Sequence, residues 1–153
     1  MLATPRKYTL VAGSAEGGTR LNAFDHALLA AGLGNLNLVR VSSILPPGAV
    51  EAPVLDIPPG ALTPTAYGTI TSDVAGEIIS AAIGVGIGEE GEYGVIMEFS
   101  GRVGRDAAEE AVRAMLAEAF QTRGRPLLRV DVRAVEHRVG DIGCAFAAAA
   151  LWY

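Results

Sequence analysis

The sequence predicts one domain of the mixed α/β (α+β) class, with many strands, few helices and two packed sheets. Its 153 residues suit a single domain, and 50% of them are apolar. The mean hydropathy of +0.34 is high for a chain in which no apolar run reaches the length of a membrane span. We therefore expect sheets that are covered on both faces, or an oligomer that hides part of each subunit's surface.

Strands are expected where a short apolar or alternating run is closed by glycine, proline or the chain end. They are residues 8–13, 37–45, 65–71, 94–99, 128–134 and 142–153. Residues 77–88 are ambiguous: their alanines permit a helix, but their isoleucines, valines and glycines favour a buried strand.

Two helices are expected, over residues 19–31 and 106–122. Both have apolar side chains at helical spacing, and glycines follow each of them. Asp106 is expected to cap the second helix. The apolar face of that helix consists of Val112, Met115, Leu116, Ala119 and Phe120.

Composition excludes several kinds of function. The net charge of −5 argues against nucleic acid as a partner. No apolar run is long enough for a membrane span, and residues 1–7 lack the apolar stretch of a signal peptide, so a cytoplasmic protein is expected. Cys144 is the only cysteine, which excludes a multi-cysteine metal site, and the two histidines are too few for an ordinary zinc site without carboxylate help, so no metal is expected.

The basic residues restrict the choice of cofactor. Of the twelve, Lys7 alone is a lysine, and it lies in what reads as an N-terminal tail. An enzyme that holds pyridoxal phosphate (PLP) as a Schiff base needs a lysine in its active site. PLP is therefore not expected as the cofactor.

The most informative segment is residues 34–47, Gly-Asn-Leu-Asn-Leu-Val-Arg-Val-Ser-Ser-Ile-Leu-Pro-Pro. It begins as an ordinary strand, places the hydroxyls of Ser42 and Ser43 side by side, and ends at two prolines. In isolation it fits a strand end that leads into a turn. Its interpretation therefore depends on the rest of the chain.

This segment resembles the processing site of pyruvoyl-dependent arginine decarboxylases. Further stretches match that family's pattern in the same order, namely residues 11–17, 21–25, 64–68, 96–98 and 143–153. Each motif is weak alone, but together they cover nearly the whole chain without a large insertion. The resemblance implies a four-layer α-β-β-α sandwich, assembled as a trimer or as a pair of trimers, with each site at the junction of neighbouring subunits.

The resemblance also implies a zymogen that cuts itself between Ser42 and Ser43. If that peptide is strained, the Ser43 hydroxyl can attack the preceding carbonyl, with proximity and strain as the main aids. Elimination and hydrolysis then leave a β chain (residues 1–42) and an α chain (residues 43–153) with an N-terminal pyruvoyl group. This ketone takes the place of PLP and forms a Schiff base with L-arginine, which is converted to agmatine and CO2 for polyamine synthesis or acid resistance.

The resemblance gives roles to five side chains. Glu98 matches the family's proton donor, and its apolar neighbours would favour the protonated acid. Asn37 resembles the residue that binds the rearranging group and later the substrate. Asp25 resembles the carboxylate that binds the guanidinium, and Leu28 resembles a wall for the aliphatic stem. The carboxylate released at Ser42 is a further candidate contact to the cation.

Plainer interpretations stay open for each residue: a solvent-facing carboxylate, a turn asparagine or a core leucine. Two alternative functions also stay open. The same pyruvoyl chemistry could act on another amino acid, although an apolar or anionic substrate would have no use for Asp25. An unprocessed homologue could instead bind a cationic metabolite without catalysis.

Overall fold

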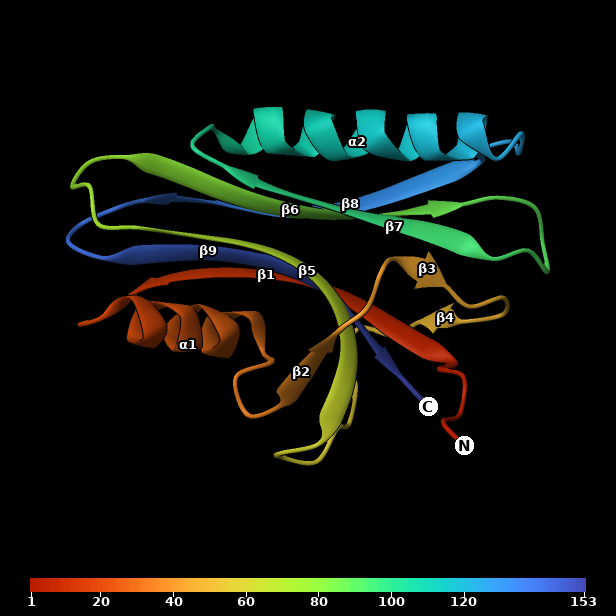
Figure 1. Ribbon diagram of the computed structural model, residues 1–153, viewed down its shortest axis with the longest axis horizontal. Helices are drawn as coiled ribbons and strands as arrows, with labels where there is room; N and C mark the ends of the chain where they lie inside the picture. Colours follow the sequence, from red (N-terminus) through yellow and green to blue (C-terminus); the bar gives the residue numbers. More distant parts are fainter.

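The computed structural model describes residues 1–153 and contains two helices and nine strands (Figure 1). The helices are α1 (Arg20–Ala31) and α2 (Arg105–Thr122), and neither combines the length and hydropathy needed to cross a membrane. The strands are β1 (Lys7–Glu16), β2 (Asn37–Arg40), β3 (Ile44–Leu45), β4 (Val50–Glu51), β5 (Leu62–Ser72), β6 (Ile78–Ile87), β7 (Gly94–Gly101), β8 (Arg129–Arg138) and β9 (Gly143–Trp152). The mixed class is confirmed, and the ambiguous residues 77–88 form mostly strand.

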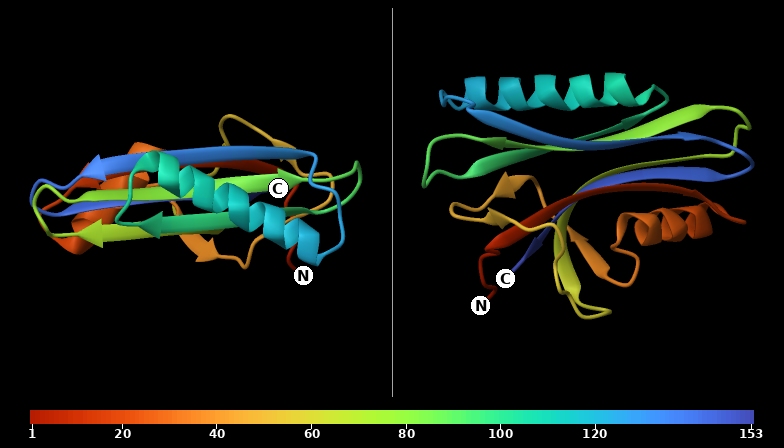
Figure 2. Two further views of the ribbon diagram at one scale, coloured as in Figure 1. Left: turned by 90° about the horizontal axis from the view of Figure 1, so that it is seen from above. Right: turned by 180° about the vertical axis from the view of Figure 1, so that it is seen from behind.

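Two sheets stack face to face, and one helix covers the outer face of each (Figure 1). Sheet A has the strand order β2-β5-β9-β1-β4, and sheet B has the order β3-β7-β6-β8. Helix α1 packs on β1 and β9 of sheet A, whereas α2 runs obliquely across the strands of sheet B (Figure 2). The layers of the protomer therefore follow the order helix, sheet, sheet, helix.

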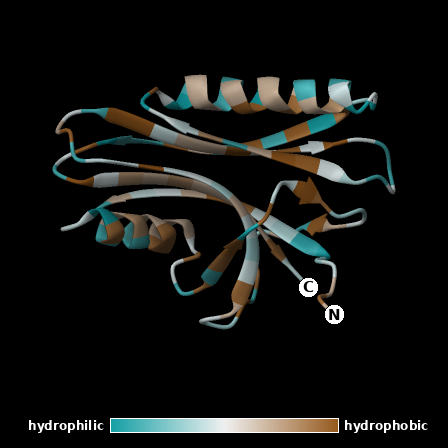
Figure 3. Ribbon diagram, viewed as in Figure 1, coloured by the Kyte–Doolittle hydropathy of each residue, from teal (hydrophilic) through white to brown (hydrophobic).

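The core between the sheets is built from side chains that alternate along β6 and β9. Ile79, Ile83 and Val85 of β6 face the alanines of β9 in this layer. The opposite side of β9 carries Phe146, which packs beneath helix α1. Because β9 is buried on both faces, its sequence is apolar almost throughout (Figure 3).

Helix α1 starts and ends at the residues that its sequence indicates. The Thr19 hydroxyl accepts a hydrogen bond from the Asn22 amide at 3.1 Å, and Gly32 ends the helix with a φ of 87°. The helix approaches β1 closely because Gly13 has no side chain: a Cβ there would lie 2.6 Å from the Ala31 nitrogen. Within residues 11–17, Gly13 is therefore required by the close packing of α1 on β1.

Helix α2 departs from the prediction at its first turn. Gly104 is the N-cap and Asp106 lies inside the helix, so the expected capping role of Asp106 is wrong. The Arg105 amide instead donates a 2.9 Å hydrogen bond to the carboxylate of Glu136 on β8. A partner from a distant strand therefore satisfies a helix terminus that local sequence seemed to satisfy.

The expected continuous strand over residues 37–45 is also wrong. Strand β2 ends at Arg40 in sheet A, where it pairs in parallel with β5. Strand β3 begins at Ile44 in sheet B, where it pairs antiparallel with β7. Residues 41–43, here called the crossing link, pass from one sheet to the other (Figure 1). The chain breaks the strand at the segment that the sequence marked for chemistry.

Candidate functional site

The crossing link is tied to both sheets. At its first residue, the Val41 amide donates to the Thr65 carbonyl of β5 at 3.2 Å. At its last, the Ser43 carbonyl accepts a hydrogen bond from the Ile96 amide of β7 at 2.8 Å. The Ser42–Ser43 peptide is thus held between anchors that belong to different layers of the sandwich.

Ser43 is the only residue other than glycine with a positive φ, at 120°. Side chains disfavour this region, and a residue held there stores about 1–3 kcal/mol of strain. The anchors on β5 and β7 maintain this conformation because the link must turn from one sheet to the other within three residues. The peptide that the sequence marked for cleavage therefore lies at the one strained non-glycine position of the backbone.

A pocket of about 280 Å³ opens beside the link. Its walls come from the N-terminal segment, the link with β3, the start of β5 and the chain end; they are Leu2, Ala3, Pro5, Val41, Ser42, Ser43, Ile44, Pro46, Pro64, Leu151 and Tyr153. Ser42 is exposed and Ser43 is half-buried. Both residues can therefore meet a small reactant from the side of this pocket.

Glu98 lies on the strand that anchors Ser43. It follows Ile96 by two residues, about 7 Å along β7, so the two side chains point to the same face. Ile96 is buried between the sheets, which places the Glu98 side chain on the inner face as well. Gly68 of β5 lies opposite: a Cβ there would be 3.3 Å from the Glu98 Cβ.

The environment of Glu98 favours its protonated form. Burial raises the pKa of this carboxyl, and the positive charge of Arg40 opposes part of that rise. Its Oε2 atom is buried and has no hydrogen-bond partner. A negative charge on a buried oxygen without a hydrogen-bond donor is costly, so the neutral, protonated carboxyl is favoured. Glu98 is thus suited to hold a proton and to give it to a bound molecule.

Arg40 is a site residue that the sequence interpretation missed. Its guanidinium lies over the Tyr67 ring, with Cζ 4.3 Å from the ring centroid, and Nη2 donates a hydrogen bond to the Tyr67 carbonyl. The one available signal was its position, two residues before Ser42, within the informative segment. Its partner lies 27 residues away in sequence, so local pattern alone could not reveal the contact.

Asn37 lies at the first residue of β2, away from the crossing link along the chain. Its Nδ2 donates to the Gly60 carbonyl at 2.9 Å, and its amide donates to Ala61. No hydrogen bond joins it to Ser42 or Ser43 within the protomer. These contacts fit the plainer interpretation, an asparagine at a strand end, and leave its side-chain oxygen available.

Asp25 and Leu28 lie on α1, away from the crossing link in the same protomer (Figure 1). Asp25 is exposed and forms no ion pair. Leu28 is 8% exposed and packs beneath the helix in the cluster that contains Phe146. The protomer therefore brings Ser42, Ser43 and Glu98 to one region but leaves the α1 pair outside it.

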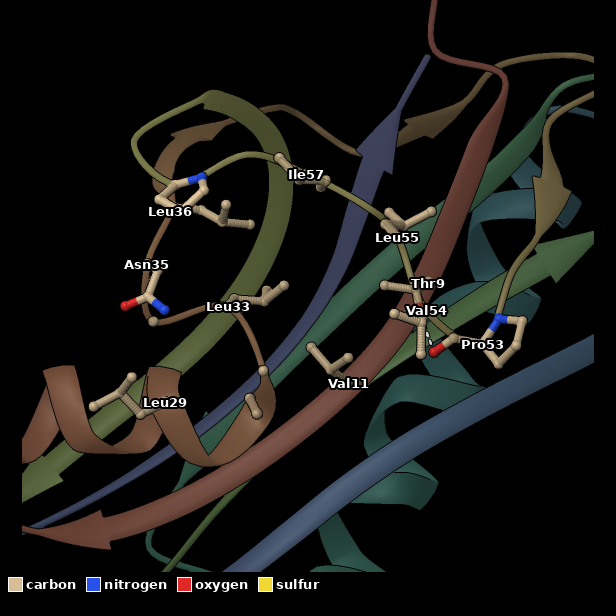
Figure 4. A pocket seen from close by; sticks show the side chains of 14 residues that line it. Thr9, Val11, Leu29, Leu33, Asn35, Leu36, Pro53, Val54, Leu55 and Ile57 are labelled. Carbon is tan, nitrogen blue, oxygen red and sulfur yellow. Dashed lines mark hydrogen bonds between the residues drawn. The ribbon is translucent and has the colours of Figure 1, made fainter.

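A second pocket, of about 320 Å³, lies between the C-terminal end of α1 and residues 53–59 (Figure 4). Apolar side chains such as Val11, Leu33 and Leu55 line it, and Asn35 adds an amide. None of the predicted site residues lines this pocket. It offers no ionisable side chain for acid–base work.

The residues near the link fit a cofactor that the chain makes from itself. The crossing link supplies a serine in a strained peptide, and β7, the strand that anchors this serine, supplies a half-buried acid with a buried Oε2 atom. Lys7 is exposed at the first residue of β1, so it is poorly placed to form a buried Schiff base with PLP. No three side chains among His, Cys, Asp and Glu are grouped to hold a metal ion.

Comparisons with known proteins agree with this description. The family model for pyruvoyl-dependent arginine decarboxylase matches residues 7–153. A protein of that name from Methanocaldococcus jannaschii is 56% identical over 150 residues, which are 97% of this chain and 91% of the relative. Proteins of the same name from Methanococcus maripaludis and Pyrococcus abyssi are 48% and 45% identical, over 97% and 98% of this chain and 92% and 96% of their own lengths.

Proposed function

This chain belongs to the pyruvoyl-dependent arginine decarboxylase family, and from that membership we propose that it cuts itself between Ser42 and Ser43 and then converts L-arginine to agmatine and CO2. The observation that carries the proposal is the positive φ of Ser43 in a link anchored to both sheets. The family accounts for the type of cofactor. The strained geometry of Ser43 supports the proposed place where the chain makes it.

The attacking hydroxyl and the peptide bond that breaks both belong to the link itself. The Ser43 hydroxyl attacks the Ser42 carbonyl carbon, and the acyl group moves from the Ser43 nitrogen to its oxygen, which relieves the strained peptide. Loss of the Ser43 α-proton then breaks its Cβ–O bond and frees residues 1–42 with a carboxylate at Ser42. Addition of water and release of ammonia leave a pyruvoyl group at the start of residues 43–153.

The pyruvoyl group supplies a carbonyl that binds the substrate amine and withdraws electrons from the bond to the departing carboxylate. Glu98 then delivers the proton that the substrate's α-carbon needs after CO2 has left. Its buried Oε2 atom and its raised pKa support this role, because a donor must be protonated before the step. The exposed amide of Asn37 is the proposed second contact to the reacting group.

The far end of the substrate needs an anionic partner. We assign this contact to Asp25, because a carboxylate binds a guanidinium through two parallel hydrogen bonds. Its exposure and its lack of an ion pair within the protomer support the assignment. Leu28 would contribute only its small exposed edge to the aliphatic stem, and the new carboxylate of Ser42 would add negative charge.

Since Asp25 lies outside the region of the link, a complete site takes it from a neighbouring subunit. We therefore propose a trimer, or a pair of trimers, with a site at each junction. Large apolar side chains that are exposed in the protomer support assembly, among them Val54 (80%), Leu21 (76%) and Leu62 (70%).

A mixing experiment tests the shared site. Asp25→Asn and Glu98→Gln chains should each be inactive, but co-expression should restore part of the activity, since some junctions combine an intact Asp25 with an intact Glu98. Co-expression without any gain over either variant would contradict a site shared between chains. Measured against lysine and ornithine as well as arginine, the same assay tests whether another amino acid is the substrate.

A further inference from the structure

The guanidinium of Arg40 is fixed beside β5 although the residue itself is exposed. It stacks on the Tyr67 ring and donates a hydrogen bond to the Tyr67 carbonyl. The ring is itself held, since it packs against the Phe146 ring with 5.5 Å between centroids. The Arg40 side chain, which has many rotamers, is thus restricted to one position by two different contacts.

That position is fixed on a carbonyl next in sequence to the glycine that faces Glu98. The Tyr67 carbonyl belongs to the peptide that leads to Gly68, and the Gly68 Cα faces the Glu98 side chain across the space between the sheets. Arg40 therefore places a permanent positive charge on the far side of the Tyr67–Gly68 peptide from Glu98. A low-dielectric interior transmits such a charge better than water does.

We propose that Arg40 is a positioning residue for the decarboxylation: its charge, held across the Tyr67–Gly68 peptide, keeps the Glu98 carboxyl able to lose its proton as well as to hold it. This inference rests on the proposed role of Glu98 as proton donor. A donor that could never ionise would not deliver its proton to the substrate's α-carbon. Burial alone favours a Glu98 carboxyl that stays protonated, and the positive charge of Arg40 opposes this effect of burial.

The other elements packed around Glu98 offer no competing charge. Strand β5 faces it with Gly68, and β6 pairs with it through Ile83. Its neighbours on the same face of β7 are Ile96 and Ser100, which carry no charge, and the Tyr67 side chain is turned toward Phe146, on the other face of sheet A. Arg40 is the charged group that lowers the pKa of Glu98 against the effect of burial.

The test is the pH dependence of kcat for CO2 release from arginine, measured on the cleaved enzyme and its Arg40→Gln and Arg40→Lys variants. The rate falls at high pH as Glu98 ionises. Without the charge, ionisation needs a higher pH, so Arg40→Gln should move this fall in kcat to higher pH. Arg40→Lys keeps the charge and should stay close to the parent profile.

Arg113→Gln is the matched control, because Arg113 is exposed on α2 in the opposite outer layer. The inference is overturned if Arg40→Gln lowers kcat or raises KM while the high-pH fall stays in place, since a purely structural or substrate-binding role would act in that way.

If Arg40→Gln does not fold, the dependence of the pH profile on salt concentration provides the second measurement. Salt screens the exposed Arg40 charge, so the high-pH fall in the parent's kcat should move to higher pH as ionic strength rises. A fall in kcat that stays at the same pH would contradict the inference.

A failure of the inference can be told apart from a failure of the proposed function. If Glu98→Gln retains full activity, the proton donor is wrongly assigned. If Glu98→Gln is inactive and the Arg40→Gln profile is unmoved, Glu98 keeps its role and only the inference about Arg40 fails.

Discussion

The carbonyl of Ser43 accepts a 2.8 Å hydrogen bond from the amide of Ile96, two residues before Glu98 on the same face of β7. One strand therefore anchors the proposed cleavage site and carries the proposed proton donor. This relationship links the maturation of the chain to its later catalysis. It also lets the two steps be separated by mutation, because different atoms of β7 serve them: a backbone amide for the first and a side-chain carboxyl for the second.

Ser43→Ala should abolish self-cleavage, because alanine has no oxygen to accept the acyl group from Ser42. A denaturing gel should show one intact chain, and CO2 release from arginine should be undetectable. Ser42→Ala is the matched control, since Ser42 contributes a carbonyl that alanine also has. That variant should cleave, and equal loss of cleavage in both variants would count against a specific role for the Ser43 hydroxyl.

Glu98→Gln should leave cleavage in place and lower kcat by about 10²–10⁴-fold, the usual contribution of a general acid. Glutamine has nearly the same shape but no proton to donate at neutral pH. Gel analysis measures cleavage, and CO2 release measures kcat on the cleaved protein. A cleaved variant with the parent's kcat would remove Glu98 from the mechanism.

Gly68→Ala should disturb the region around Glu98. The added Cβ would lie 3.1 Å from the Phe99 carbonyl oxygen and 3.3 Å from the Glu98 Cβ, so the two sheets must separate slightly. Overpacking of this kind costs about 1–3 kcal/mol of folding free energy. Thermal unfolding should show it. Gly18→Ala, where a Cβ would meet nothing within 4 Å, should unfold near the parent's temperature. Equal melting temperatures for both variants would contradict the close approach of β5 and β7.

Glu16 should stabilise the fold in a pH-dependent way. Burial opposes its ionisation, but hydrogen bonds from His137 and from the amides of Asp141 and Gly140 lower its pKa overall. A carboxyl whose pKa is lower when folded stabilises the protein above its unfolded pKa of about 4.3. That stabilisation is lost as the pH falls through the lowered value.

Thermal unfolding checks this pH-dependent stabilisation by Glu16. The parent and Glu16→Gln are each measured at neutral pH and near pH 3. The variant should melt at a lower temperature at neutral pH, and the difference should shrink in acid. Since His137 lies on β8 and Glu16 on β1, the contact joins the two sheets. A constant difference at both pH values would show that the ionised carboxylate does not provide the stabilisation.

The sequence predicts the elements better than it predicts their junctions. The apolar run at the chain end locates β9, because a strand buried on both faces leaves a continuous apolar signature, whereas the run over β6 favours a strand but also permits a helix. The same signature cannot show that residues 37–45 divide between two sheets, since no glycine or proline interrupts them. The break depends on pairing with β5 and β7, which lie far along the chain.

The candidate site, too, is only partly predictable from local sequence. The motif around Ser43 and the apolar neighbours of Glu98 are visible in the sequence, whereas Arg40 acquires its importance only when β2 pairs with β5 and brings it to Tyr67. The false cap at Asp106 has a similar cause, because Glu136 reaches the helix terminus from β8. Long-range pairing decides these contacts, and local patterns do not contain it.

The intact mass of the purified, denatured protein tests the central claim most directly. We predict two fragments, residues 1–42 and residues 43–153, whose masses add up to that of the uncut chain plus one water minus one ammonia. The larger fragment is then lighter by one ammonia than the same fragment with an N-terminal serine. A single uncut chain, or two fragments with an intact serine at position 43, would contradict a pyruvoyl group derived from Ser43.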